Sequence, residues 1–181
     1  MGEVVSVTAE VPGFRLLSGI TAVSIRFLAG DTSARAAVEA QGLPWVQSPG
    51  EMAGTDPFVC WRAPQERFAI GLNAAPLRAL LASLAPGQHD LAFAIDVSEA
   101  LTVFELHGPQ LESWLVRVVD ATAVPREAGS MSRCRFADVP ALLLRKTVDC
   151  LWLVAERPLA PYIADWLEYT RSAVSATGEL H

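Results

Sequence analysis

The chain has 181 residues, of which 51% are apolar and 19% charged, and its formal net charge is −6. This length fits a single domain, and so apolar a composition excludes intrinsic disorder. Net negative charge repels phosphate, so we expect no nucleic-acid partner. Uncharged runs stay near ten residues, short of the ~18–20 that a membrane span needs, so we expect no membrane segment.

The acidic N-terminus lacks the pattern of a secretory signal, and three cysteines without a CxxC motif favour free, buried thiols. Both features predict a cytoplasmic protein. The bases are thirteen arginines and one lysine, Lys146. The excess of apolar residues favours a subunit that hides surface in a permanent complex, with a stable alanine-rich monomer as the alternative.

The first half alternates extended and helical patterns. Residues 1–19 show no sustained period and 41–57 are rich in proline and glycine, so both are expected to be irregular. Between them we expect a strand at 20–28 and a helix at 33–41. After them we expect a β-hairpin of strands 58–63 and 67–72, and then a second helix at 74–85.

The second half repeats this order. Strands are expected at 91–98 and 101–108, a helix at 110–119, a polar irregular stretch at 120–132, a hairpin at 139–146 with 150–156, and a helix at 159–172. The glycines that end the first strands, Gly30 and Gly108, are 78 residues apart. We therefore predict an α+β fold, a single domain over 1–181 built of two pseudo-repeats of a strand-helix-hairpin-helix unit, at about 20–86 and 90–172.

Two helices carry apolar stripes at helical spacing. In one, Leu111, Trp114, Leu115 and Val118 follow the i, i+3, i+4, i+7 pattern, and residues 162–167 of the last helix do likewise. Such helices cover a sheet face, so Trp114 and Trp166 are predicted to anchor the core.

No catalytic motif stands out. There is no dinucleotide-binding or phosphate-binding glycine pattern and no nucleophile elbow. His89 and His181 lack partners at metal-ligand spacing, and His107, at a strand end, is predicted to pack or lie at a rim rather than to act as a ligand or base. We therefore predict no catalytic, cofactor-binding or metal-binding residue.

Two features deserve inspection as contact sites. Asp96 and Ser98 follow a strand, where they either cap the next turn, which is the commoner role, or grip a polarised ligand ring. Leu43, Pro44 and Trp45 lie in a long loop, where a tryptophan beside a proline is often a contact anchor. We predict these three residues as a partner interface.

Three long segments of the second half carry a family resemblance. Residues 96–115, 129–146 and 150–169 resemble the gamma subunit of heterotetrameric sarcosine oxidase, a relative of the folate-binding domain of aminomethyltransferase. The resemblance rests on Asp96 and Ser98, on the Leu-His-Gly-Pro run at 106–109, and on Arg157 before a helix with Trp166-Leu167. The first half fits more loosely, through 23–30, 42–45 and the hairpin at 58–72.

The resemblance implies an aminomethyltransferase folate-binding-domain-like fold and a non-catalytic structural subunit. Alpha, beta and delta subunits would be its partners and would hold FAD, FMN, NAD, tetrahydrofolate and zinc, whereas this chain would hold no cofactor. The complex would oxidatively demethylate sarcosine or a related N-methyl amino acid. Two alternatives remain: a tetrahydrofolate-binding module or small one-carbon transfer protein using Asp96, and an unrelated α+β interaction domain.

Overall fold

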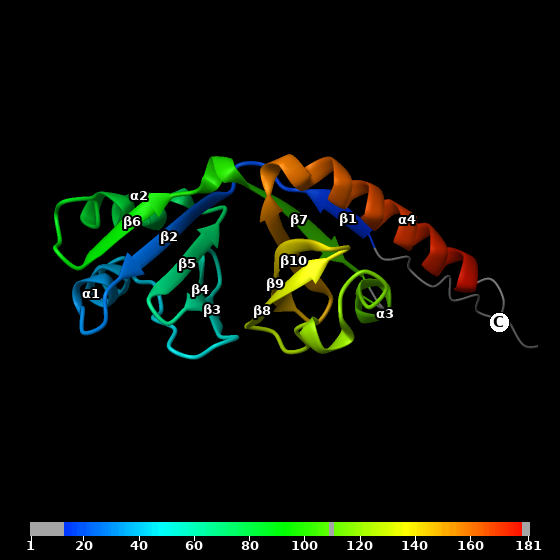
Figure 1. Ribbon diagram of the computed structural model, residues 1–181, viewed down its shortest axis with the longest axis horizontal. Coiled ribbons are helices and arrows are strands. Elements are labelled where there is room, and N and C mark those ends of the chain that lie inside the picture. Colours follow the sequence, from blue (N-terminus) through cyan, green and yellow to red (C-terminus); the bar gives the residue numbers. More distant parts are fainter. Residues whose placement is uncertain (1–12, 109–110, 179–181) are drawn as a thin grey trace, which may run out of the picture.

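The computed structural model describes residues 13–108 and 111–178, with side chains up to residue 172. Two five-stranded antiparallel sheets lie at its centre, and helices cover the outer face of each (Figure 1). A third apolar cluster combines residues of both sheets and joins their inner faces. The molecule is therefore a four-layer α/β/β/α arrangement.

The first sheet has the strand order β3-β4-β5-β2-β6. Its strands and helices are β2 (Thr21–Phe27), α1 (Ser33–Ala40), β3 (Met52–Gly54), β4 (Phe58–Ala63), β5 (Glu66–Gly71), α2 (Ala74–Ser83) and β6 (Ala92–Asp96).

The second sheet has the order β8-β9-β10-β7-β1 when taken in the same direction. Its elements are β1 (Gly13–Leu16), η1 (Ser98–Ala100), β7 (Leu101–His107), α3 (Leu111–Leu115), η2 (Ala121–Ala123), β8 (Ser130–Phe136), β9 (Val139–Thr147), β10 (Cys150–Glu156), η3 (Arg157–Leu159) and α4 (Ala160–Gly178).

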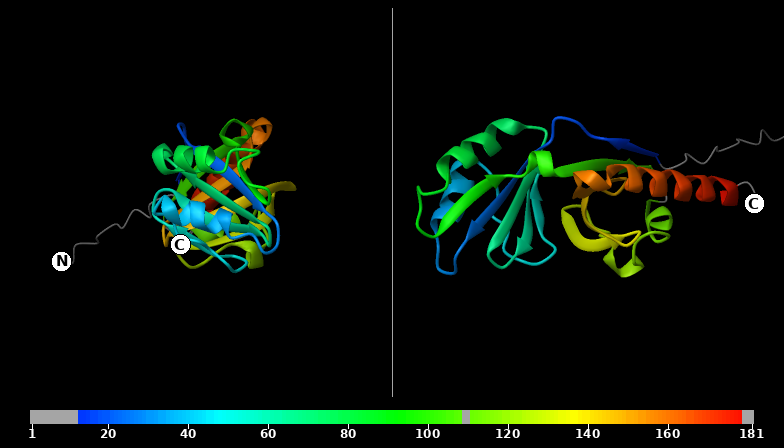
Figure 2. Two further views of the ribbon diagram at one scale, coloured as in Figure 1. Left: turned by 90° about the vertical axis from the view of Figure 1, so that its left-hand side faces the viewer. Right: turned by 45° about the horizontal axis from the view of Figure 1, so that its top comes forward.

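The two sheets match strand for strand, and each receives an edge strand from the other half of the chain. β1 precedes β2 in sequence but pairs with β7 of the second sheet, from Gly13 opposite His107 to Leu16 opposite Phe104. β6 precedes β7 but pairs with β2 of the first sheet, from Val23 opposite Asp96 to Phe27 opposite Ala92. The chain therefore crosses twice between the sheets, midway along the molecule, as the right-hand view of Figure 2 shows.

The alternation within β2 explains how one strand serves two cores. Val23 and Ile25 are fully buried in the cluster formed with α1 and α2. Ala22, the residue before Val23, points to the other face of the sheet and is fully buried in the cluster shared with the second sheet. Because successive strand residues point to opposite faces, a strand that is buried on both sides has apolar residues at almost every position.

The two sheets also contact each other at their other edges, which are formed by β3 and β8. The Met52 amide donates to the Gly129 carbonyl and the Met131 amide to the Gly50 carbonyl, both at 2.9 Å. These bonds connect an edge strand of each sheet and satisfy backbone groups that an edge would otherwise expose.

Most predicted elements are confirmed, and the α+β class with them. Three strands were not predicted, β1 in 1–19, β3 in 41–57 and β8, which overlaps the stretch 120–132. The helix predicted over 110–119 is wrong in length, since α3 ends at Leu115. The Val118 amide then bonds to the Leu115 carbonyl three residues back, a tighter turn, although Val118 stays buried as its place in the apolar stripe indicated.

Candidate functional site

A groove runs between the two sheets, next to the segment η1 where the chain crosses from one sheet to the other. It consists of two adjoining hollows of about 670 and 380 Å³, both lined by Arg62, Leu101 and Glu156. The larger hollow reaches β2 and β6, and the smaller reaches β8 and β9. We call the pair the inter-sheet groove.

Five arginines from four elements line the inter-sheet groove: Arg26 of β2, Arg62 of β4, Arg133 and Arg135 of β8, and Arg157 of η3. Two glutamates, Glu99 and Glu156, also line it, which leaves a formal excess of three positive charges. The whole chain carries −6, so the groove has the opposite sign to the molecule. Such a local field attracts anionic groups.

Between these charges the lining is apolar. Phe68, Leu142 and Val154 belong to the core shared by the sheets, or pack against it, and their edges form part of the smaller hollow. In the larger hollow Ile95 keeps 44% of its surface exposed. A groove that combines apolar surface with a few charged groups has the usual character of a binding site.

Glu66 holds Arg62 in place and lies near Arg26. Its side chain is 15% exposed, and one carboxylate oxygen accepts from Ser24 Oγ at 2.8 Å and from Arg62 Nη1 at 3.1 Å, with Arg26 Nη2 at 3.9 Å. The Arg62 guanidinium also lies 5.5 Å from the centre of the Phe68 ring. Arg62 is therefore held in place where the two hollows meet.

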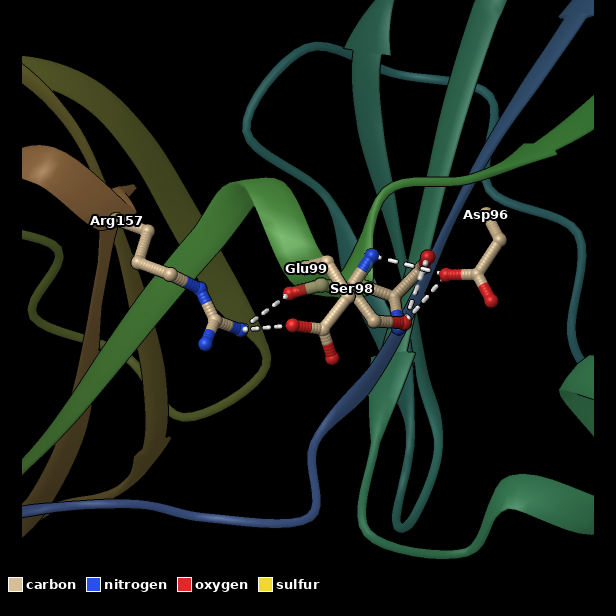
Figure 3. A network of polar contacts seen from close by, with 5 residues as sticks. Asp96, Ser98, Glu99 and Arg157 are labelled. Atoms are coloured by element: carbon tan, nitrogen blue, oxygen red, sulfur yellow. Dashed lines mark hydrogen bonds and ion pairs between the residues drawn. The ribbon is translucent and has the colours of Figure 1, made fainter.

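Asp96 and Ser98 cap a turn, as the sequence predicted (Figure 3). One Asp96 oxygen accepts from the Ser98 amide at 2.9 Å and from Ser98 Oγ at 2.5 Å, and Ser98 Oγ accepts from the Ala22 amide at 2.9 Å. Asp96 is not among the residues that line the groove. Its position gives no support to the ligand-gripping role.

Arg157 links η3 to the same turn. Its Nη2 donates to the Ser98 carbonyl at 3.2 Å and lies 3.3 Å from a Glu99 carboxylate oxygen (Figure 3). Glu99 is 93% exposed, so this ion pair is weak and readily exchanged for another partner.

The two arginines of β8 have fewer contacts with other side chains than Arg62 and Arg157 have. Arg133 and Arg135 are both exposed, two residues apart on one face of the strand. Arg135 donates to the Asp138 carbonyl in the turn that follows. Among the residues that the structure describes, Arg133 has no hydrogen-bond or ion-pair partner. Sequence reasoning did not find these residues as a group, although the Arg-x-Arg alternation was visible.

The predicted interface residues pack within the molecule. Leu43 is 7% exposed and belongs to the core under α1 and α2. Trp45 is half-buried, with its ring 5.4 Å from that of Phe27 and 4.9 Å from the Arg67 guanidinium carbon. Pro44 lies between them, half-buried. A contact of these residues with a partner stays a prediction.

The nucleophilic and metal-ligating residue types are scattered. His107 is exposed at the end of β7, His89 Nε2 lies 3.1 Å from the Ser83 carbonyl oxygen, and His181 lies outside the described residues. Burial raises the pKa of the Cys60 thiol, and that of Cys134 to about 11. Within 13–108 and 111–178, no three histidine, cysteine or acidic side chains gather as metal ligands would, and no helix is long and apolar enough to cross a membrane.

No protein-family model and no curated protein sequence matches the chain. Among solved structures, its fold resembles a chain of heterotetrameric sarcosine oxidase from Corynebacterium sp. U-96, with a TM-score of 0.79 and 24% identity over 90% of this chain and 84% of that one. It also resembles glycine cleavage system aminomethyltransferase T from Bartonella henselae, with a TM-score of 0.59 and 14% identity, of which it spans 46%. At these identities the likeness establishes the fold alone, an α+β fold that this chain shares with parts of both structures.

Proposed function

We propose that this chain is a non-catalytic structural subunit, of the gamma type, in a sarcosine oxidase-type complex that oxidatively demethylates sarcosine or a related N-methyl amino acid. The observation that carries the proposal is the fold match over 90% of this chain and 84% of a chain of heterotetrameric sarcosine oxidase. A match that spans nearly all of both chains favours a whole subunit over one domain of a larger enzyme.

The surface of the chain supports the same proposal. Several large apolar side chains are well exposed, among them Leu16 at 59%, Leu28 at 54% and Tyr169 at 70%. Obligate subunits bury such surface against their partners. In the proposed complex, located in the cytoplasm, alpha, beta and delta subunits hold FAD, FMN, NAD, tetrahydrofolate and zinc, and this chain contributes contacts rather than reacting groups.

We also propose that the two halves arose by duplication of one unit within a single domain over 1–181. The matching strand orders of the two sheets support this. The predicted pseudo-repeats at 20–86 and 90–172 then each require one further edge strand, β3 and β8, and the first repeat must also start earlier to include β1, the counterpart of β6.

Co-purification from the native host tests the subunit proposal. A C-terminally tagged chain should recover stoichiometric partner chains with the yellow absorbance of bound flavin. Recovery of a lone, colourless chain that remains monomeric and well behaved would refute it.

The tetrahydrofolate-binding alternative is tested by calorimetry on the same chain. Its motivating residue, Asp96, is engaged in capping Ser98. Saturable heat with tetrahydrofolate, weakened by Asp96→Ala, would favour that alternative, whereas titration without heat would reject it.

The predicted interface at Leu43, Pro44 and Trp45 has its own test. Trp45→Ala should weaken recovery of the partner chains without unfolding this one if the loop is a contact. Because Trp45 packs against Phe27 and Arg67, the same change should instead lower the unfolding temperature if the residue serves only the core. Circular dichroism of the recovered variant separates the two outcomes.

A further inference from the structure

We infer that the inter-sheet groove binds an extended acidic segment of a partner chain, in which apolar side chains alternate with carboxylates. The inference rests on the proposed function, which requires partner chains. It goes further by assigning the face of this chain that meets a partner and the chemistry of what docks there.

The distribution of charge favours an extended segment over a compact anion. A small anion is held by guanidiniums that converge on one point. Here the arginines are spread along the groove, from Arg26 on β2, through Arg62 where the hollows meet, to Arg133 on β8. Charges spaced in this way match carboxylates spaced along a chain.

The availability of these guanidiniums favours an external partner. Arg133 has no partner among the described residues, and the carboxylate paired with Arg157 is 93% exposed. Arg26 is 3.9 Å from the nearest Glu66 oxygen, a long distance for an ion pair, and its side chain is 57% exposed. Incoming carboxylates would therefore displace little that holds the fold together.

The apolar lining accounts for the remaining contacts of such a segment. Ile95, 44% exposed, lies in the larger hollow, and the edge of Phe68 lies in the smaller. In an extended segment successive side chains point to opposite sides. Apolar residues would face this surface while acidic neighbours reach the arginines on either side.

The first experiment compares charge-reversal variants within the co-purified complex. Arg133→Glu combined with Arg157→Glu should weaken the complex about fivefold to tenfold at ~0.1 M salt, because rim charges act through a Debye length of about 10 Å. The difference should shrink as salt approaches ~1 M. The matched control combines Arg78→Glu with Arg35→Glu, which changes net charge equally on α2 and α1, outside the groove. Equal weakening by both pairs, or by neither, would overturn the inference.

The second experiment identifies the occupant. Lys146 is the only lysine in the chain, so Arg133→Lys places one new amine at the groove while keeping its charge. A carbodiimide then joins that amine to a carboxylate in direct contact, and mass spectrometry locates the amide bond. The expected product links position 133 to an Asp or Glu of the partner within an acidic, apolar-containing run. Arg78→Lys should give no such product.

Other products would overturn the inference. A link from position 133 to Glu3 or Glu10 would assign the groove to the N-terminal segment of this chain, and a link between two copies would assign it to self-association. Absence of any partner link in an intact complex would also refute it while the subunit proposal stands. If the wild-type chain recovers no partner at all, the subunit proposal fails first.

Discussion

Arg67 provides the sharpest test of how the first half is held together. Its side chain is buried, and its Nε donates to the Val46 carbonyl at 2.6 Å while Nη1 donates to the carbonyls of Ala63 at 2.8 Å and Glu66 at 3.0 Å. One guanidinium thus ties the loop before β3 to the β4–β5 hairpin. Burial lowers the pKa of Arg67, and the negative charge of Glu51 opposes that shift.

Arg67→Met keeps most of the volume but removes these donors. A hydrogen bond to a charged group contributes about 1.5–3 kcal/mol when its loss leaves a buried partner unsatisfied. Only the bond to Val46 is fully buried, and the two at the hairpin can be replaced by water. We therefore count about 2 kcal/mol for the first and about 1 kcal/mol for the others together, some 3 kcal/mol. For a chain of this length that lowers Tm by about 6–12 °C.

Thermal and urea unfolding of the full chain, followed by tryptophan fluorescence, measures this loss. The control is Arg35→Met, because Arg35 pairs with Glu39 on the exposed side of α1 at 2.8 Å and such pairs contribute under about 0.5 kcal/mol. A stability within about 1 kcal/mol of wild type for Arg67→Met would show that these carbonyls do not depend on the guanidinium.

Three further outcomes are expected. The Glu51 carboxylate accepts two backbone amide bonds, at 2.7 and 2.9 Å, which hold its pKa below the usual 4.5. Its stabilising effect is therefore present above that value and is lost as pH falls through the lower folded pKa. Glu51→Gln should cost about 1 kcal/mol at pH ~7 and almost nothing at pH ~2, as urea midpoints would record. Trp114→Phe removes the buried Nε1 bond to Thr170 Oγ1 at 2.8 Å and should cost about 2 kcal/mol. In a double-mutant cycle with Thr170→Val, additive costs would contradict that bond. Burial raises the pKa of Cys60, so iodoacetamide at pH ~8 should modify it only after unfolding, and prompt modification detected by mass spectrometry would contradict its burial.

The sequence predicted the elements whose apolar pattern is long and regular. The β4–β5 hairpin was found because Val59 and Phe68, like their neighbours, are buried on both faces of the sheet. β8 was not predicted because only Met131 and Phe136, near its two ends, are buried, while the residues between them are half-buried or exposed. Short edge strands such as β1 and β3 carry too few residues to show a period.

The candidate site could not be predicted in the same way. Capping by Asp96 is local, so spacing alone indicated it. The groove instead combines arginines from four elements, from Arg26 to Arg157, and only the tertiary fold brings them together. Sequence periodicity carries no information about which exposed arginines share one depression.

The reciprocal placement of β1 and β6 makes the halves mutually dependent. A cleavage between α2 and β6 would leave an N-terminal fragment that carries an edge strand of the other sheet and lacks one of its own. Neither fragment would fold independently, so we expect both halves to lose structure in one cooperative transition. The same pairing would arise in a homodimer of one unit that exchanged leading strands. On that view the chain is a strand-swapped dimer made permanent by a covalent linker, the segment 84–91, and fragment complementation would reassemble it.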